Sequence, residues 1–420
     1  MQVVTAIPRS DELQRYGGAE EALLRDVSGI PLLIRVLATG IRAGGDRALI
    51  IHTGEIPVRV ANPLRTSKTL AGLRELEFTR SVQFDPASPK SWQGISGTLD
   101  DEFLWLPWNW VTNKHGLTGL KPIEDRPESW NRPCRLSSSA ALSLEPPKPL
   151  PRMLGEGSAV TSPSSVSAAE RWLVAHSGKP LDGIYSRFNR RLCRPLVRAL
   201  AHTWVSPNMV TLAGLLAAIV SAYCFAQGSY LTSLAGAVLF FLSGLLDEVD
   251  GMLARVRFSD SVFGTWFEGS VDNFSYLLLF VGVTVGLYRQ RGSQEALVGE
   301  LALIGAILSI AVISWQRGRL THATRPNEYC AKMYQLLEKD RGNRLSRIVR
   351  RIEFLLKKGV FIHYVLLFTL LGLLPVLLRM AAFASNVTWV VALCLSYRFL
   401  GPQRQSAGAS ELSKAAEVNS

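Results

Sequence analysis

Apolar and polar positions are distributed differently in the two halves of this chain. The second half contains apolar runs that are long enough to cross the hydrocarbon core of a bilayer. The expected spans are 209–226, 230–246, 262–288, 296–313, 360–378 and 381–399, and the second is expected to continue as a helix to about Arg255. This pattern predicts a membrane bundle of six transmembrane helices, preceded by a part with shorter apolar runs.

The shorter runs in the first part follow the order strand, helix, strand. Residues 1–8 and 47–52 are short, β-branched runs, and residues 31–44 have the periodicity of an amphipathic helix that ends in glycine. Residues 103–108 are a candidate later core strand. Because a strand, helix, strand connection places both strands parallel in one sheet, a small α/β domain is expected.

One segment of this α/β part resembles the sugar nucleotidyltransferases. Residues 27–37 are similar to the segment that follows the phosphate loop in that family. Residues 9–18, which take the place of that loop, contain Asp11 and Glu12 instead of the glycine-rich, basic turn that cradles a triphosphate. We therefore interpret this part as a degenerate nucleotidyltransferase-like domain with a binding or structural role, and catalysis by the domain is the alternative.

Changes in composition along the chain indicate four parts. The α/β domain is expected at 1–136, a linker rich in Ser and Pro with a short helix at 137–178, the membrane domain at 179–405 and a polar tail at 406–420. A capping box at 167–170 is expected to open the short helix. Because such a linker is flexible, the membrane domain is expected to work without residues 1 to about 165.

The charge balance indicates an anionic partner. Lys and Arg number 46 against 34 Asp and Glu, a net charge of +12, which fits nucleic acid or an anionic membrane surface. The apolar spans beside the basic runs favour the membrane and argue against nucleic acid. Residues 184–198 combine arginines with an apolar side chain at every fourth position, which predicts an amphipathic helix on the leaflet or, as the alternative, a helix packed on the α/β domain.

Basic residues also predict the topology. They gather before the first span, after the second and after the fourth, which lie on one side if every span crosses. By the positive-inside rule this side is cytoplasmic, so both termini face the cytoplasm, with Arg289 and Arg291 as exceptions on the other side.

Five cysteines without metal-ligand spacing predict free thiols, and together with an N-terminus that lacks a signal peptide they fit a reducing compartment. The sequence is also compatible with a homodimer.

Four carboxylates stand at the adjoining, cytoplasmic ends of the second and third spans. Asp247 and Asp250 lie at i and i+3. Gly264, Glu268 and Asp272 follow at i, i+4 and i+8, so each set shares one helix face. An acidic side chain in a bilayer costs at least about 2.5 kcal/mol unless it has a partner, so the two faces are expected to converge. Oxygen ligands of this kind suit Mg²⁺ or Mn²⁺ rather than zinc.

These residues resemble the motif of the CDP-alcohol phosphatidyltransferases, D-x2-D-G-x2-A-R-x8-G-x3-D-x3-D. Every position is matched except the third acidic one, where Glu268 stands, and the resemblance covers residues 179–401. The matching residues are Asp247, Asp250, Gly251, Ala254, Arg255, Gly264 and Asp272. The family resemblance implies an integral-membrane enzyme that transfers a substituted phosphate from a CDP-alcohol to the hydroxyl of an acceptor alcohol and releases CMP.

The resemblance also implies roles for individual residues. It implies that Asp247, Asp250, Glu268 and Asp272 hold Mg²⁺ or Mn²⁺, and that Asp272 also acts as a general base. The residues implied in substrate binding are Asn208, Gly251, Ala254, Arg255, Gly264, Arg317 and Arg319. Arg317 and Arg319 are similar to a Tyr-x-Arg-Ala-Arg run of the family, and as an alternative they are ordinary interfacial residues on the basic side of the membrane.

The substrate pair stays open at this stage. A nucleotidyltransferase-like domain fused to this membrane domain resembles bifunctional enzymes that make CDP-inositol and join it to inositol phosphate. A decayed front domain would instead leave a phospholipid synthase that uses CDP-diacylglycerol. Glu268 is one methylene longer than the family's aspartate, and the front part lacks a phosphate loop. The alternative function is therefore a catalytically inactive membrane protein whose soluble domain is a binding module.

Overall fold

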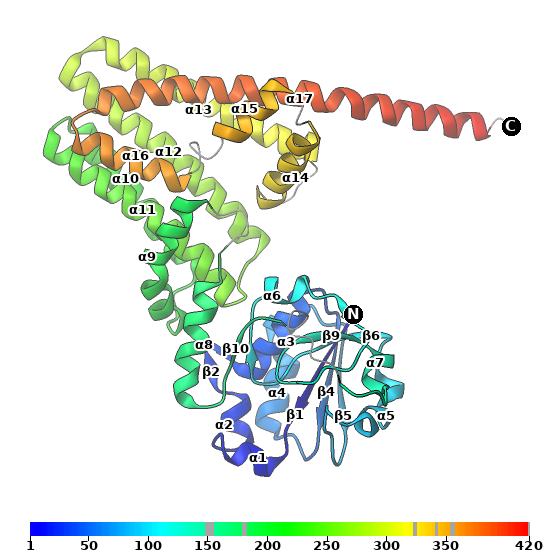
Figure 1. The fold of residues 1–420 in the computed structure, drawn as a ribbon. Helices are drawn as coiled ribbons and strands as arrows, with labels where there is room; N and C mark the ends of the chain where they lie inside the picture. The colour runs from blue at the N-terminus through cyan, green and yellow to red at the C-terminus, as the bar shows by residue number, and fades with distance from the viewer. Residues whose placement is uncertain (148–154, 179–182, 322–325, 341–342, 353–357, 419–420) are drawn as a thin grey trace. The chain divides into compact units, whose positions relative to one another are not determined.

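The structure, a computed structural model, describes residues 1–147, 155–178, 183–321, 326–340, 343–352 and 358–418 (Figure 1). It divides into two compact units. The α/β unit comprises Met1–Lys179, Arg194–Trp204 and Met252–Ser259, and the helical unit comprises Pro180–Cys193, Val205–Gly251 and Asp260–Ser420. Two short segments that follow residue 179 in the sequence, Arg194–Trp204 and Met252–Ser259, therefore also belong to the α/β unit.

A mainly parallel sheet forms the centre of the α/β unit. In the described residues its strand order is β5-β4-β1-β6-β9-β8. The β6–β9 pair is antiparallel and the other pairs are parallel, so β9 and β8 run opposite to the other four strands. The strands are β1 Gln2–Ile7, β4 Arg47–His52, β5 Glu75–Arg80, β6 Glu102–Trp105, β8 Pro122–Ile123 and β9 Cys134–Ser137. The expected strands at 1–8 and 47–52 are confirmed as parallel neighbours, with helix α3, Leu32–Arg42, between them in the sequence.

The sheet is buried because its central strands carry apolar side chains. Val4 of β1 and Leu49 of β4 are adjacent in register and fully buried. They share a core with Trp92, Trp105 and Trp130, whose ring centroids lie between 5.2 and 5.7 Å apart. The elements around the sheet are α1 Ser10–Gln14, α2 Ala19–Leu23, β2 Asp26–Val27, β3 Ile30–Pro31, α4 Val58–Thr66, α5 Pro89–Gln93, β7 Trp110–Val111 and α6 His115–Thr118.

The range expected to be a linker contains several of the described elements. They are α7 Ser138–Leu142, β10 Ser158–Ala159, which pairs with β7, and α8 Pro163–Ala175, while residues 148–154 lie outside the described part. The expected capping box at 167–170 is wrong, because Ser162 and Ser165 form the capping box of α8. Ser162 offers its hydroxyl to the first turn and Pro163 fits the first helical position, so the helix begins earlier than its apolar pattern indicates.

The helical unit is built from long apolar helices. Among the described residues, five helices are long and apolar enough to cross a membrane: Pro207–Ala226, Tyr230–Val256, Val262–Arg291, Ser293–Arg319 and Leu374–Phe399. They correspond to α10 Pro207–Ala226, α11 Tyr230–Val256, α12 Val262–Arg291, α13 Ser293–Gln316 and the first part of α17 Leu374–Val418. The other helices are α9 Ile184–Ala201, α14 Pro326–Lys339, α15 Arg344–Ile352 and α16 Lys358–Leu370.

Six spans are not confirmed in the part of the chain that the structure describes. The expected fifth span, 360–378, is divided by a turn, so that α16 ends at Leu370 and the last helix begins at Leu374 rather than at 381. Gly372 lies in this turn with φ +68°, a left-handed conformation that ends helices. Leucines flank the turn on both sides. The hydropathy pattern therefore runs across the break without a signal.

Small residues allow α10 and α12 to approach closely. A side chain at Gly282 would overlap the backbone of Ala222, and one at Gly286 would overlap the carbonyl group of Phe225. Such contacts are typical of helix packing in membranes, where burial of apolar surface does not itself drive association. They fix α10 beside α12, and these helices carry several of the predicted site residues.

Candidate active site

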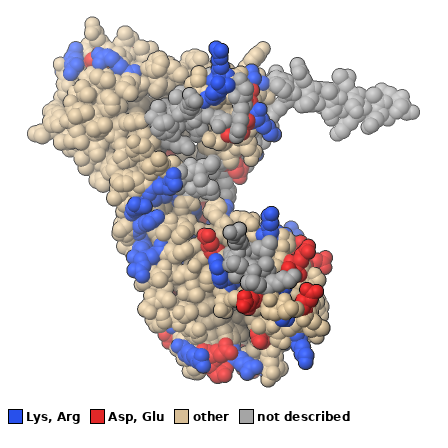
Figure 2. Space-filling model, in the orientation of Figure 1, with Lys and Arg blue, Asp and Glu red and all other residues tan. Residues whose placement is uncertain are grey.

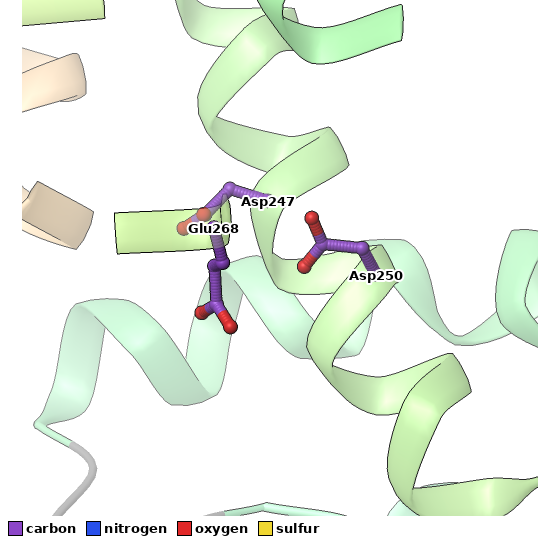
Figure 3. A group of neighbouring side chains, drawn as sticks. All are labelled: Asp247, Asp250 and Glu268. Atoms are coloured by element: carbon purple, nitrogen blue, oxygen red, sulfur yellow. The ribbon is translucent and has the colours of Figure 1, made fainter. Parts of the chain in front are cut away.

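Three of the predicted acidic residues come together in the helical unit (Figure 3). Asp247 and Asp250 project from α11 and Glu268 projects from α12, and one carboxylate oxygen of each lies within 4.8 Å of the others. Asp250 is buried, whereas Asp247 and Glu268 are partly exposed. The helical spacing of the motif thus produces a convergent group of oxygen atoms from two helices. Asp272, one turn after Glu268 on α12 and partly exposed, lies outside this group of described residues.

Thr211 of α10 supports the group, and sequence reasoning missed it. Its hydroxyl donates a buried hydrogen bond of 2.5 Å to Oδ2 of Asp250. This bond fixes one carboxylate oxygen and so orients the other. A threonine inside an apolar span is common and gives no signal in the sequence, so only the packing of α10 against the acidic helices identifies it.

The neighbouring acid Glu248 has a different environment. Its Oε2 accepts from Nε of Arg190 in α9 at 2.7 Å, and both side chains are largely buried. Nearby on α9, Asn189 donates to the carbonyl oxygen of Gly359 at 3.2 Å. The arginine neutralises Glu248, and this pair ties α9 to the helix that carries the acidic group.

The outer face of α9 has the predicted amphipathic character. Ile184, Phe188 and Leu192 are exposed, with between 50% and 77% of their surface accessible. Arg187 and Arg191 are exposed beside them, and Figure 2 shows Lys and Arg side chains gathered over this helix. An exposed apolar row beside arginines suits the interface of an anionic leaflet.

Two predicted substrate-binding residues lie side by side at the start of α10 and α12. A methyl group built on Gly264 would stand 3.3 Å from Oδ1 of Asn208 and 3.1 Å from Oγ of Ser261. Ser261 caps α12 by accepting from the backbone nitrogen of Gly264 at 2.9 Å. Because the Asn208 side chain is exposed, its amide is available to a ligand beside the first turn of α12.

The remaining predicted residues lie in three places. Gly251 follows Asp250 in α11, whereas Ala254 and Arg255 lie in the last turns of that helix and belong to the α/β unit. Nε of Arg255 donates to the carbonyl oxygen of Ser177 at 2.5 Å. Arg317 and Arg319 lie in a π-helical turn, Arg317–Thr321, that follows α13, and Arg319 is exposed. The five cysteines, each within the described part, form no disulfide bonds, as expected.

Comparison with known protein families identifies the class of this site. Residues 204–390 match the family described as CDP-alcohol phosphatidyltransferase. The matched range includes α10, α11 and α12 and therefore all of the convergent acids. This part of the chain therefore resembles the CDP-alcohol phosphatidyltransferases, as the motif predicted.

Several curated proteins are similar to parts of this chain. Archaetidylinositol phosphate synthase of Methanothermobacter thermautotrophicus is 32% identical over 130 residues, 31% of this chain and 59% of the relative. The bifunctional IPC transferase and DIPP synthase of Thermococcus kodakarensis is 30% identical over 201 residues, 47% of this chain and 43% of the relative. Phosphatidylinositol phosphate synthase of Cutibacterium acnes is 27% identical over 203 residues, 46% of this chain and 92% of the relative. The chain spans less than two thirds of the first two relatives.

Proposed function

We propose that this protein transfers a substituted phosphate from a CDP-alcohol to the hydroxyl of an acceptor alcohol and releases CMP. The observation that carries the proposal is the convergence of Asp247, Asp250 and Glu268 inside a domain of this family. Relatives named as synthases of archaetidylinositol phosphate and phosphatidylinositol phosphate support a role in phospholipid or inositol phosphate biosynthesis. We propose an inositol phosphate as the acceptor and a lipid-linked CDP-alcohol as the donor.

The acidic group fits Mg²⁺ or Mn²⁺. Its described members offer only carboxylate oxygens, which are hard ligands, and they come from two helices that can surround an ion. When bound, such an ion would act as a Lewis acid and neutralise the charge that develops on the leaving CMP. We propose Asp247, Asp250 and Glu268 as ligands, with Asp272 as a further ligand on the same face of α12.

The residues of the chain have separate tasks in this proposal. Thr211 holds the Asp250 carboxylate in one orientation through its hydrogen bond. Asp272 accepts the proton of the acceptor hydroxyl as a general base. The amide of Asn208 binds the donor, and Gly264, which has no side chain, leaves space for the donor beside the first turn of α12. Gly251, Ala254, Arg255, Arg317 and Arg319 are the other proposed substrate contacts, with the arginines suited to phosphate oxygens.

We also propose the topology and the division of the chain. A sixth crossing by α16 gives an even number of spans, so both termini and the acidic group face the cytoplasm, where the basic loops belong. The transferase domain is proposed at 179–405, after the α/β domain at 1–136 and the segment 137–178, with a tail at 406–420. An anionic bilayer, rather than nucleic acid, accounts for the net charge, and the domain is compatible with a homodimer.

CMP release from membranes tests the proposed reaction. Membranes with the full-length protein receive a panel of CDP-alcohols carrying a radiolabelled cytidine, each with inositol phosphate, inositol or glycerol phosphate. We expect release that requires Mg²⁺ or Mn²⁺, that is lost in Asp250→Asn and that persists in Glu300→Gln, a control that removes an exposed acid of α13. Full release in EDTA would contradict the metal site. Absence of release with every pair, in a properly inserted protein, would favour the inactive membrane protein.

A further inference from the structure

The loop that joins α11 to α12 is held by the α/β unit. The end of α11 and the start of this loop, Met252–Ser259, belong to that unit. Because α11 carries Asp247 and Asp250 and α12 carries Glu268, the loop is the direct covalent connection between the two parts of the acidic group. Its conformation therefore affects the separation of the carboxylates.

Phe258 is the central residue of this contact. Its ring faces two guanidinium groups of α3, with Cζ of Arg35 and Cζ of Arg42 at 5.1 and 4.7 Å from the ring centroid. Arg42 also donates from Nη2 to the Phe258 carbonyl oxygen at 2.8 Å. The backbone of Phe258 has φ 54°, in the left-handed region that a bulky side chain rarely adopts. Surrounding contacts have to hold it in that conformation.

Arg35 forms a rigid support for this ring because its side chain is fully buried. Its Nε donates to the carbonyl oxygen of Val27 at 3.0 Å, and its Nη2 donates to that of Ser28 at 3.4 Å. Burial lowers the pKa of Arg35 to about 9, so the guanidinium stays charged near neutral pH and keeps its attraction for the ring. A charge buried at this depth is costly to the fold, and the contact with Phe258 gives it a role.

The same part of the α/β unit also contacts the end of α9. Gly29, at the tip of the β2–β3 hairpin, has φ +80°, and a side chain there would overlap the carbonyl oxygen of Ala201. Arg257, beside Phe258, donates from Nε to the same oxygen at 3.1 Å and from Nη2 to the carbonyl oxygen of Leu200. These carbonyls lie in the last turn of a helix, where partners within the helix are lacking.

Helix α8 adds polar contacts at this place. Oε1 of Glu170 accepts from the backbone nitrogen of Ser28 at 2.8 Å and lies 2.9 Å from Nε2 of His202. Nδ1 of His202 lies 3.1 Å from Oδ2 of Asp26. The helix that composition assigned to a linker is therefore bonded to both the hairpin and the segment that follows α9, within one unit.

We propose that the α/β unit is a positioning module for the transferase, in which α3 holds the α11–α12 loop through Phe258 and so sets the spacing of Asp250 and Glu268. Phe258 and Arg42 are positioning residues, which act through the loop. This inference rests on the proposed function. It replaces the expectation that the membrane domain works without residues 1 to about 165, since the proposed contact couples the front part to the acidic group.

The test uses the full-length protein and two measurements, Mn²⁺ binding by electron paramagnetic resonance in detergent and CMP release in membranes. Phe258→Ala removes the ring, Arg42→Met removes one guanidinium and leaves the ring in place, and Phe258→Trp keeps an aromatic face. Phe78→Ala is the matched control, because the ring of Phe78 in β5 also faces a guanidinium, with Cζ of Arg65 at 5.7 Å, but belongs neither to the loop nor to α3. Arg42→Met keeps the test decisive if Phe258→Ala fails to insert.

We expect Phe258→Ala and Arg42→Met to weaken Mn²⁺ binding and to lower kcat for CMP release by roughly tenfold to a hundredfold, since a misplacement of about 1 Å at catalytic groups has effects of this order. KM for the donor should change little, and Phe258→Trp and Phe78→Ala should resemble the wild type. The inference is wrong if Phe258→Ala and Arg42→Met bind Mn²⁺ and turn over like the wild type, or if Phe78→Ala loses as much. A third outcome separates the two proposals. If the wild type binds Mn²⁺ but releases no CMP, and Phe258→Ala and Arg42→Met weaken that binding, the proposed function is overturned and the positioning role stands.

Discussion

Replacement of Thr211 by valine tests how this residue of α10 affects metal binding by the acidic group. Valine has nearly the same shape but cannot donate a hydrogen bond, so Oδ2 of Asp250 loses the partner that stands at 2.5 Å. Asp250 is only 3% exposed, so water has little access to replace that hydroxyl. We expect weaker metal binding and slower transfer, because the carboxylate is less well oriented and less well solvated.

The size of the effect follows from the charge and the burial. A hydrogen bond to a charged group contributes about 1.5 to 3 kcal/mol, which corresponds to roughly 10- to 150-fold in an equilibrium constant. Loss of an outer partner of a metal ligand has a similar measured range, roughly 10- to 100-fold. We therefore expect Thr211→Val to raise the Mg²⁺ concentration for half-maximal CMP release by about tenfold or more.

The assay is a Mg²⁺ titration of CMP release in membranes that contain equal amounts of inserted protein. Thr211→Ser keeps the hydroxyl and should restore most of the wild-type response. Thr369→Val is the matched control, because the Thr369 hydroxyl is also buried but donates to the carbonyl oxygen of Val365 within α16. An unchanged Mg²⁺ response in Thr211→Val, or an equal shift in Thr369→Val, would refute the reasoning.

Three further predictions concern the acidic group, its ionic neighbour and the front domain. Glu268→Asp restores the residue of the family and should keep or raise CMP release, and a dead variant would mean that the surrounding structure depends on the longer side chain. Arg190→Met leaves Glu248 buried without its arginine and should lower the stability in detergent by about 3 to 5 kcal/mol, measured as a lower Tm, with recovery in the double variant with Glu248→Leu. Full-length Asp250→Asn protein should release no pyrophosphate from CTP with any sugar or polyol phosphate, and release would show that the front domain is catalytic after all.

Much of the site could be predicted because helical periodicity is regular. Once Asp247 and Asp250 are assigned to one helix and Glu268 to the next, their spacing decides which faces carry them, and the cost of burying acids in a bilayer requires those faces to meet. The sheet was predictable for a related reason, since short β-branched runs on either side of an amphipathic helix specify a parallel pair. Local patterns were sufficient in both cases.

The features that were missed depend on tertiary contacts or on a single residue. The turn at Gly372 is hidden because leucines continue on both sides of it, so hydropathy does not mark the end of α16. Thr211 is one hydroxyl in an apolar helix, and its importance comes only from Asp250. Phe258 is an ordinary apolar residue in the sequence, and its partners are more than two hundred positions away.

The close contact between α10 and α12 has a consequence for sequence variation. Gly282 and Gly286 lie several turns from the acidic group, yet any larger residue at either position pushes the two helices apart. That displacement would carry Thr211 away from Asp250 and Asn208 away from Gly264. In a saturation mutagenesis of the whole chain, these two glycines should tolerate almost as few substitutions as the acids themselves. A map of mutational tolerance would then mark the small residues between α10 and α12 as part of the functional site, although they do not contact the substrate.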